Sequence, residues 1–440
     1  MLAFLQNFWW FLVLIGVMIV LHELGHYLMA RLFDVKVETF SLGFGPRLFG
    51  TKGKETDFCV CAIPLGGYVK MTGEQLGEGQ TADPRALTSK PRWQRLLIAF
   101  AGPATNIVLA ILLLTGLYMM EFQKIPSPKS PIVGHLDPDG AAEKAGIRVG
   151  DQVVEIDGIQ EPTWETIAVR EIASAKKAMD VYVVRNGQRM NFSVTPVYDE
   201  KQGIGSAGWL PEIDVQMGSY SPEIDVAKRA GLQKGDVFVS LNGVPIHSSA
   251  RFVEVLDETK GSPVQVVYLR NGQRREVTLT PVWAEVEGKQ RWRIGALLEP
   301  RVEIIKLSFA DAVAESCRQN LQSTKLLYRV LQGMLERRMS PKSLEGPIGI
   351  ARLSGQAARE GATSFIGLMA AVSLNLAIFN LLPIPILDGG VMLMLLVEML
   401  LRRDLDLRVK EAVVRAGFVF LMVVVVFVLY NDIAKILPAG

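Results

Sequence analysis

Two histidines and a glutamate stand at a spacing that suits zinc chemistry. The run H-E-L-G-H from His22 to His26 fits the pattern H-E-x-x-H. On a helix this pattern places both imidazoles on one face, at positions i and i+4, where two nitrogens can bind one tetrahedral Zn²⁺. Glu23 lies beside them as a candidate general base for a hydrolytic water. We therefore predict a zinc centre with His22 and His26 as ligands and Glu23 as the catalytic residue.

Two histidines leave such a site incomplete, because a catalytic zinc usually has three protein ligands and one open position. The third apolar stretch of the chain ends in N-L-L-P-I-P-I-L-D-G-G, from Asn380 to Gly390. Its two prolines break the helix, and unwound backbone at membrane depth is tolerated only inside protein or beside a wet cavity. Asp388 at the end of the break is the predicted third ligand. Its alternative role is to cap a following helix over 391–403.

The segments that must position these residues are apolar. Of the 440 residues 49% are hydrophobic and 21% are charged, and no charged residue occurs in 1–21, 96–120 or 361–387. Each run is long enough to span a bilayer, which takes about 20 residues as a helix. A fourth run, 416–430, is shorter, and Arg415 and Lys435 at its ends can snorkel to the interfaces. We predict a polytopic α-helical membrane protein with transmembrane helices over 1–30, 96–120, 361–387 and 413–435.

The distribution of charge predicts the orientation. The net charge of +2 gives no reason to expect nucleic-acid binding. Lys and Arg residues are concentrated in 31–95 and between the third and fourth apolar runs. By the positive-inside rule these segments are cytoplasmic, so the metal centre lies near the cytoplasmic side, and both termini and the long segment 122–360 are periplasmic. The first run has no basic leader and no small-residue cleavage site, so we expect it to be retained.

The long periplasmic segment contains an internal repeat. A-G-I-R-V-G-D from Ala145 returns as A-G-L-Q-K-G-D from Ala230, and R-N-G-Q-R from Arg185 returns from Arg270, both at an offset of 85. Two tandem domains are therefore predicted, over about 128–200 and 213–283. The motif, followed by a short strand and Asp-Gly or Asn-Gly, resembles PDZ domains of the bacterial protease type. PDZ domains take an extended peptide as an added strand; the alternative is that these domains are spacers with an unused groove.

The two membrane motifs together resemble the site-2 protease family of intramembrane zinc metalloproteases, and in particular its bacterial sigma-E-regulating branch with two PDZ domains. The resemblance covers essentially the whole chain and implies His22, His26 and Asp388 as zinc ligands and Glu23 as catalytic base. It also implies a membrane-associated β-hairpin within about 56–71, joined by a turn at 64–66, whose edge pairs with an unwound substrate. The residues that would contact substrate are Gly67, Tyr68, Val69, Lys70, Met71, Asn375 and Asn380. The alternative roles of the two asparagines are to brace the helix break or to pack helices together. Asn106 is similar to a family residue of the second helix, and we interpret it as a packing group.

An amphipathic helix is predicted over 309–338, since Val313, Cys317 and Leu321 recur at i+4 amid charges. The function implied by the resemblance is hydrolysis of a peptide bond within the membrane segment of single-span proteins, such as an anti-sigma factor or a remnant signal peptide, in the bacterial inner membrane. The PDZ pair would dock substrate, by a peptide or a new C-terminus, or act as a size filter. The alternative function is a non-catalytic membrane PDZ scaffold with a structural zinc.

Overall fold

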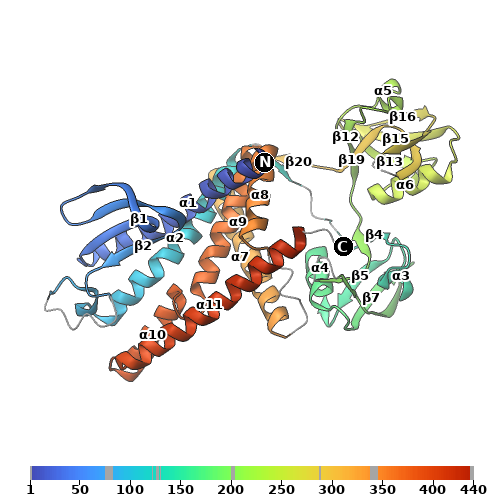
Figure 1. Cartoon of the computed structure of the whole chain (residues 1–440). Helices are drawn as coiled ribbons and strands as arrows, with labels where there is room; N and C mark the ends of the chain where they lie inside the picture. The colour runs from blue at the N-terminus through green and yellow to red at the C-terminus, as the bar shows by residue number, and fades with distance from the viewer. Residues whose placement is uncertain are drawn as a thin grey trace. The chain divides into compact units, whose positions relative to one another are not determined.

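The computed structural model (Figure 1) describes residues 2–74, 83–120, 122–124, 128, 130–199, 204–286, 289–336 and 345–436. The chain divides into two compact units. One, called the helical unit, comprises Met1–Phe122, Lys306–Tyr328 and Leu344–Gly440, and the other, called the β unit, comprises Gln123–Ile305 and Arg329–Ser343. The predicted metal ligands belong to the helical unit, and both sequence repeats belong to the β unit.

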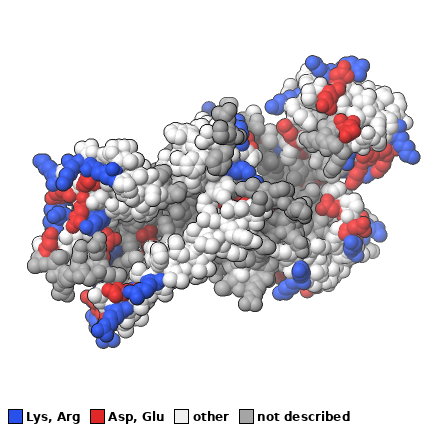
Figure 2. All heavy atoms as spheres, in the orientation of Figure 1, with Lys and Arg blue, Asp and Glu red and all other residues white. Residues whose placement is uncertain are grey.

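Within the described residues, four helices are long and apolar enough to cross a membrane. They are α1 (Leu2–Leu32), α2 (Arg92–Met119), α9 (Ala362–Leu381) and α11 (Leu407–Ile436). Their apolar spans contain 20 to 29 residues, and about 20 suffice to cross the hydrocarbon core. Figure 2 shows charged side chains gathered at the end of this unit where β1, β2 and α10 lie, and little charge along the helices. Val423 and Val426 of α11 are 63% and 66% exposed, as expected for a helix that faces lipid.

The helical unit also contains the helices α8 (Pro347–Glu360) and α10 (Asp388–Leu401), the 3₁₀ turn η1 (Leu87–Ser89), and α7 (Phe309–Leu335) as far as Tyr328. The start of α8 is held by Asp432 of α11, whose carboxylate accepts hydrogen bonds from the backbone N–H groups of Gly346, Ile348 and Gly349 at 2.9, 2.9 and 3.2 Å. A carboxylate at a helix N-terminus satisfies unpaired donors and complements the helix dipole. This contact joins α11 to α8.

The amphipathic helix α7 buries a narrow face of small and polar side chains. Along its apolar stripe Leu321 is 55% accessible and Val313 is half-buried, whereas Ala312 and Ser316 are fully buried. The Thr115 hydroxyl of α2 donates to the Ser316 hydroxyl at 3.2 Å. Small side chains allow two helices to approach closely, and hydroxyls then bond across the contact. Packing therefore selected the small polar face of α7. Residues 337 and 338 of the predicted helix lie outside the described residues.

The predicted hairpin within 56–71 is wrong in its pairing. Strands β1 (Val37–Lys52) and β2 (Asp57–Met71) are both long and bent, and Phe40 of β1 pairs with Phe58 and with Val69 of β2. The first half of β1 therefore lies between the two halves of β2, which were predicted to be neighbours. The prediction failed because sequence proximity favoured a local turn at 64–66, while the preceding segment 37–44 supplied a closer partner for both halves. Residues 67–71 form an edge of this sheet.

The β unit contains two modules built from matching elements. The first has β4 (Val133–Leu136), α3 (Ala141–Lys144), β5 (Gln152–Ile156), β6 (Ile159–Gln160), α4 (Trp164–Ala173), β7 (Met179–Arg185), β8 (Gln188–Val194), β9 (Val197–Asp199), β10 (Ile204–Ser206) and β11 (Trp209–Pro211). Its described sheets have the orders β6-β5-β7-β8, β11-β4 and β10-β9. The second has β12 (Val215–Tyr220), α5 (Val226–Arg229), β13 (Val237–Leu241), β14 (Val244–Pro245), α6 (Ser249–Glu258), β15 (Val264–Arg270), β16 (Gln273–Leu279), β17 (Val282–Val286), β18 (Lys289–Arg293) and β19 (Ala296–Pro300).

In the second module the main sheet has the order β16-β15-β13-β12-β19, with β14 beside β13 and a separate β17-β18 pair. Strand β3 (Phe122–Lys124) pairs with β20 (Glu303–Ile305). The two cores repeat at the offset of 85: Val153, Ile156, Ile167, Met179 and Val181 of the first module correspond to Phe238, Leu241, Phe252, Val264 and Val266 of the second, and all are buried. One apolar pattern thus folds twice.

The repeated R-N-G-Q-R motif has a structural cause. Arg185 donates through Nε and Nη2 to the two carboxylate oxygens of the buried Asp151 at 2.7 and 2.6 Å. Arg270 repeats this contact with Asp236 at 2.8 and 2.7 Å. In each module the arginine also donates to a backbone carbonyl, that of Gly146 or Gly231. A two-pronged pair of this kind joins the Gly-Asp turn to the hairpin strand.

We expect Arg185→Met to destabilise the first module alone, by about 3 kcal/mol, because it leaves the buried Asp151 charge without its partner. Hydrogen exchange of the full chain measures this, with the unaltered second module as internal reference. Arg270→Met should give the mirror-image result. Equal protection of both modules in Arg185→Met would contradict a stabilising role for the pair.

Candidate metal centre

His22 and His26 lie on one face of α1, one turn apart, as their spacing predicts. Their Nε2 atoms are 3.3 Å from each other, and each residue is 8% exposed. A histidine inside an apolar membrane helix is energetically costly unless it has a polar partner or binds an ion. The two rings therefore require a polar group from elsewhere in the chain, or an ion, beside their Nε2 atoms.

Asp388 supplies that group from a distant part of the chain. Helix α9 ends at Leu381, the backbone unwinds through Pro383 and Pro385, and α10 begins at Asp388. Asp388 Oδ2 lies 3.1 Å from His22 Nε2, and Oδ1 lies 3.4 Å from His26 Nε2. Asp388 also occupies the first position of α10, so the alternative role as a helix-start residue is compatible with ligation.

The two glycines after Asp388 allow this tight return. A Cβ at Gly389 would lie 2.3 Å from the Leu382 carbonyl oxygen, and one at Gly390 would lie 2.3 Å from the Ile384 carbonyl oxygen. Any side chain at either position would push the start of α10 away from the unwound backbone. The Gly-Gly pair thus fixes where the Asp388 carboxylate meets the histidines.

The donor set fits a zinc ion. One ligand atom from each of His22, His26 and Asp388 lies within 4.8 Å of the others. Two nitrogen ligands at roughly 2.0–2.1 Å from a tetrahedral Zn²⁺ are about 3.3 Å apart, which matches the observed Nε2–Nε2 separation of 3.3 Å. Gly102 of α2 leaves this space free, because a Cβ there would lie 2.2 Å from His26 Nε2. Two nitrogens and a carboxylate oxygen are the donors that zinc prefers.

Helix α2 also orients both rings. His26 Nδ1 lies 2.8 Å from the Ile98 carbonyl oxygen, so Nδ1 carries the proton and Nε2 keeps its lone pair for a metal. Asn106 is fully buried, and its side-chain amide lies 3.2 Å from His22 Nδ1. The sequence interpretation of Asn106 as a packing group was therefore too weak. The signal that could have found it is a lone amide in the uncharged helix that follows the H-E-x-x-H segment.

The orientation of the Asn106 amide depends on the His22 tautomer, and metal binding at Nε2 requires the tautomer with the proton on Nδ1. With Nδ2 toward His22, the Asn106 Oδ1 atom is buried without a partner. Turning the amide by half a rotation lets Oδ1 accept from His22 Nδ1–H and places the Nδ2 donors where Oδ1 lay. This His22 tautomer leaves Nε2 free to bind an ion, so the turned amide is the orientation that fits metal binding.

We expect Asn106→Leu to lower zinc affinity about 10- to 100-fold, the usual cost of removing a group that orients a ligand. Asn106→Asp keeps an acceptor for Nδ1–H and should retain most of the affinity. Competition with a chromophoric chelator measures both variants. Equal affinities of the two variants would show that Asn106 only fills space.

A cavity of about 560 Å³ adjoins the three ligand atoms. Glu23 lines it together with Asn380 and the edge of β2. Gly67 of that edge sits directly against the general-base candidate, since a Cβ there would lie 3.0 Å from Glu23 Cγ. The cavity therefore brings the ligands, a carboxylate and a strand edge to one place.

A family model described as Peptidase family M50 matches residues 10–424. The chain belongs to peptidase family M50. The regulator of sigma E protease of Salmonella typhi is 30% identical over 99% of this chain and 100% of its own length. The regulator of sigma-E protease RseP of Escherichia coli is 30% identical with the same coverage. A solved PDZ domain of an SdrC-like protein from Listeria monocytogenes is 19% identical and covers 20% of this chain and 90% of its own, with a TM-score of 0.17, too low to support an argument. The M50 chain is thus a metalloprotease.

The structure separates the predicted substrate-contacting residues of this M50 metalloprotease into two groups. Those that line the cavity are Gly67, Tyr68, Val69, Met71 and Asn380. Lys70 and Asn375 are not among its lining residues. Lys70 Nζ pairs with Glu38 Oε2 at 2.9 Å on the sheet, and Asn375 is exposed on α9.

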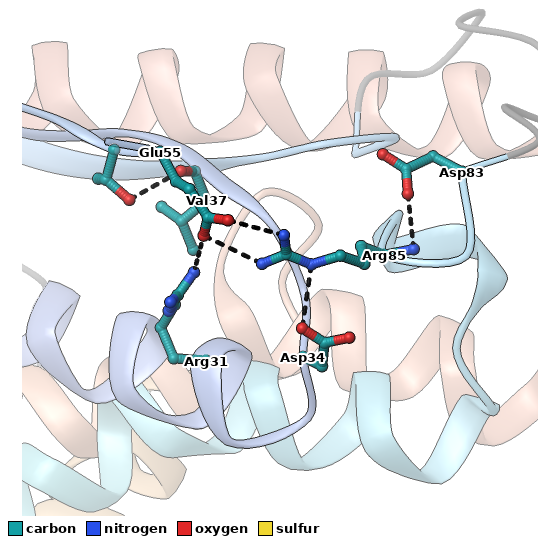
Figure 3. A network of polar contacts seen from close by, with 7 residues as sticks. Arg31, Asp34, Val37, Glu55, Asp83 and Arg85 are labelled. Atoms are coloured by element: carbon teal, nitrogen blue, oxygen red, sulfur yellow. Dashed lines mark hydrogen bonds and ion pairs between the residues drawn. The ribbon is translucent and has the colours of Figure 1, made fainter. Parts of the chain in front are cut away.

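A polar network holds the sheet of the M50 chain to the end of α1 (Figure 3). Glu55, between β1 and β2, accepts from Arg31 at the end of α1 and from Arg85 Nη1 and Nη2 at 2.8 and 3.0 Å. Arg85 Nε also pairs with Asp34 at 3.0 Å. Arg85 and Arg31 together hold the pKa of Glu55 at about 2, below its ordinary 4.5. The Glu55 pairs with Arg31 and Arg85 are therefore intact at neutral pH and are lost as the pH falls from about 4.5 toward 2.

Proposed function

We propose that this metalloprotease hydrolyses a peptide bond within the transmembrane segment of single-span membrane proteins, with Zn²⁺ held by His22, His26 and Asp388. The observation that carries the proposal is the position of the ligands. Two lie in the apolar helix α1 and the third follows the break after the apolar helix α9. A cavity beside them contains Glu23 and a strand edge. A soluble substrate would not need a site at this depth.

A peptide bond inside a transmembrane helix is protected, because the helix satisfies its own backbone hydrogen bonds. Cleavage therefore requires a short unwound stretch whose freed backbone groups find new partners. The edge of β2 at Gly67–Met71 offers such partners by strand addition. Asn380, which lines the same cavity, can hold a second backbone group of the unwound segment.

When bound, Zn²⁺ polarises the scissile carbonyl and lowers the pKa of water toward about 7. Glu23 takes the proton of the attacking water and passes it to the leaving amide nitrogen. His26 and His22 keep fixed tautomers through Ile98 and Asn106. The adjoining cavity supports this catalytic role over a purely structural zinc in a membrane scaffold, because a structural site is closed by a fourth protein ligand.

The relatives named as regulators of sigma E support a role in sigma-factor control. We propose a membrane-anchored anti-sigma factor as substrate and remnant signal peptides as further substrates. The proposed location is the bacterial inner membrane, with the metal centre near the cytoplasmic face and the β unit and both termini periplasmic. Its support is the excess of Lys and Arg in the segments after α1 and before α11.

The experiment that tests this function uses the purified chain in lipid vesicles and a reporter protein with one apolar helix. Mass spectrometry of the products locates the cleaved bond. We expect a cut within the helix that a zinc chelator stops and added Zn²⁺ restores. Cleavage only outside the helix, or cleavage that is indifferent to chelation, would overturn the proposal.

We propose further that the two β modules are PDZ domains that control access of substrate. Deleting residues 128–283 separates the two forms of this role. A size filter predicts that the deletion variant cleaves a substrate whose periplasmic domain is intact, which the wild type leaves uncut. A required docking site predicts that the deletion variant cleaves neither intact nor trimmed substrate. Immunoblots of tagged substrate in cells measure both.

A further inference from the structure

The first module has a cavity of about 480 Å³ between α4 and the strand β11. Strand β11 pairs with β4 along one edge, and its sheet has only these two strands among the described residues. Its residues Trp209 to Pro211 also line the cavity, with Leu210 51% exposed. An unpaired strand edge facing a helix across a groove is the arrangement that accepts an extended peptide as an additional strand.

One end of this groove is already occupied by a carboxylate of the module itself. Glu171 of α4 accepts from the Ala207 backbone N–H at 2.5 Å through Oε1 and from Trp209 Nε1 at 2.9 Å through Oε2. The preceding strand β10 lies close against α4, since a Cβ at Gly205 would lie 2.4 Å from the Glu171 carbonyl oxygen. A peptide's C-terminal carboxylate is captured by free backbone N–H groups, and the Ala207 N–H at the end of this groove is such a donor. Here Glu171 takes that place.

The second module shows that the fold does not require this glutamate. The residue at the same place in α6, 85 positions later, is Leu256, which is 3% exposed in the core. Ala207 corresponds to Ile294, since their carbonyls accept from Ala142 N and Ala227 N at 2.8 and 2.7 Å. The fold of the second module thus accepts a buried leucine at the position that Glu171 occupies in the first module.

The charges around the groove have one sign. Among the described residues that line it, Asp137, Glu165 and Glu171 are charged and none is Lys, Arg or His. Burial raises the pKa of Glu171, and the nearby Asp137 raises it further, while the N–H donors of Ala207 and Trp209 oppose the shift. A peptide carboxylate placed here would meet like charge, whereas a cationic side chain would meet complementary charge.

We propose that the groove between α4 and β11 binds an extended internal segment of a polypeptide that carries a Lys or Arg side chain, and that Glu171 bars a free C-terminal carboxylate from it. The proposal rests on the peptide-binding role given to the modules above. It concerns one groove of the β unit and does not depend on cleavage at the zinc centre.

The test uses the full chain immobilised in detergent and a library of short N-acetylated peptides of random sequence. The library is made in two forms, one ending in a free carboxylate and one in a carboxamide. Captured peptides are counted by mass spectrometry. Ala168→Trp, which fills the groove from α4, and Leu210→Trp, which fills it from β11, define the background from the second module and the membrane helices.

For the wild type, after subtraction of this background, we expect carboxamide peptides to be captured about tenfold better than free acids, with Lys and Arg enriched. Glu171→Leu, the residue of the second module, and Glu171→Gln should both remove the preference. Thermal unfolding shows whether Glu171→Leu and Glu171→Gln are folded, and one folded Glu171 variant is enough for the test. Equal capture of acids and amides by the wild type, an unchanged ratio in a folded Glu171 variant, or no capture above background would overturn the proposal. Peptide capture without any cleavage of the membrane reporter would leave it standing while refuting the proposed function.

Discussion

Glu23→Gln is expected to keep zinc and to lose cleavage of a single-helix reporter by about 1,000-fold or more, within the range that a positioned general base contributes. Glutamine has nearly the size of glutamate, so the cavity beside His22 and His26 keeps its shape. It lacks the carboxylate that takes the proton of the attacking water. Single-turnover cleavage and metal content measured on the same preparation check the two halves of this expectation.

Glu23→Asp is the matched control for this substitution. It keeps the carboxylate but withdraws it by one methylene, so a general base acting at a defined distance should give activity between the wild type and Glu23→Gln. Normal cleavage by a folded, zinc-loaded Glu23→Gln protein would remove Glu23 from the mechanism. Loss of zinc in that variant would instead assign Glu23 to the metal centre.

Asp388→Asn is expected to lose both zinc and activity. Removing a direct ligand should weaken zinc binding by more than the roughly 10- to 100-fold typical of orienting groups such as Asn106. The amide is similar in size, so Gly389 and Gly390 still allow the start of α10 to approach α1. The variant therefore tests the charge and the ligand oxygen of Asp388 while the backbone at the start of α10 stays unchanged.

Zinc titration followed by reporter cleavage measures the effect, and high free Zn²⁺ should restore part of the activity if folding is intact. Asp404→Asn is the control in the same unit, because Asp404 lies in an exposed pair with Arg92 at 2.9 Å and should keep zinc and cleavage. Wild-type zinc affinity in Asp388→Asn would mean that the third ligand is another residue. These outcomes also separate Asp388 from Glu23, whose glutamine variant should stay metal-loaded.

The predicted strand pairing within 56–71 failed for a physical reason that applies beyond this chain. The two halves of β2 have alternating residues and a glycine-containing turn between them, which locally favours a hairpin. The residues of β1 compete for the same backbone donors and acceptors, and Phe40 reaches both Phe58 and Val69. Strand partners are chosen by total pairing and packing, which a local pattern does not contain.

The buried face of α7 shows the same limit for helices. Its apolar stripe was a sound prediction of a helix, but a stripe can face lipid as well as protein. Ser316 and Asn320 are buried instead; the small Ser316 lets α2 approach and accepts from Thr115, and Asn320 donates to the Ser316 carbonyl within α7. Helical periodicity shows that one face of a helix is apolar, but it does not show whether that face contacts lipid or another helix.

By itself the sequence determined what depends on local spacing or composition. The H-E-x-x-H interval places two imidazoles on one side of a helix, uncharged runs require an apolar surrounding, and the offset of 85 repeats one module. Asp388 was predicted because the zinc site lacked a third ligand and the proline break at membrane depth had to lie inside protein or beside a wet cavity. Only the tertiary structure decided that Asn106 and Ile98 orient the histidines and that Glu171 occupies the loop of its own groove. These contacts depend on the register between elements that are distant in the chain, and register is set by packing of the whole fold.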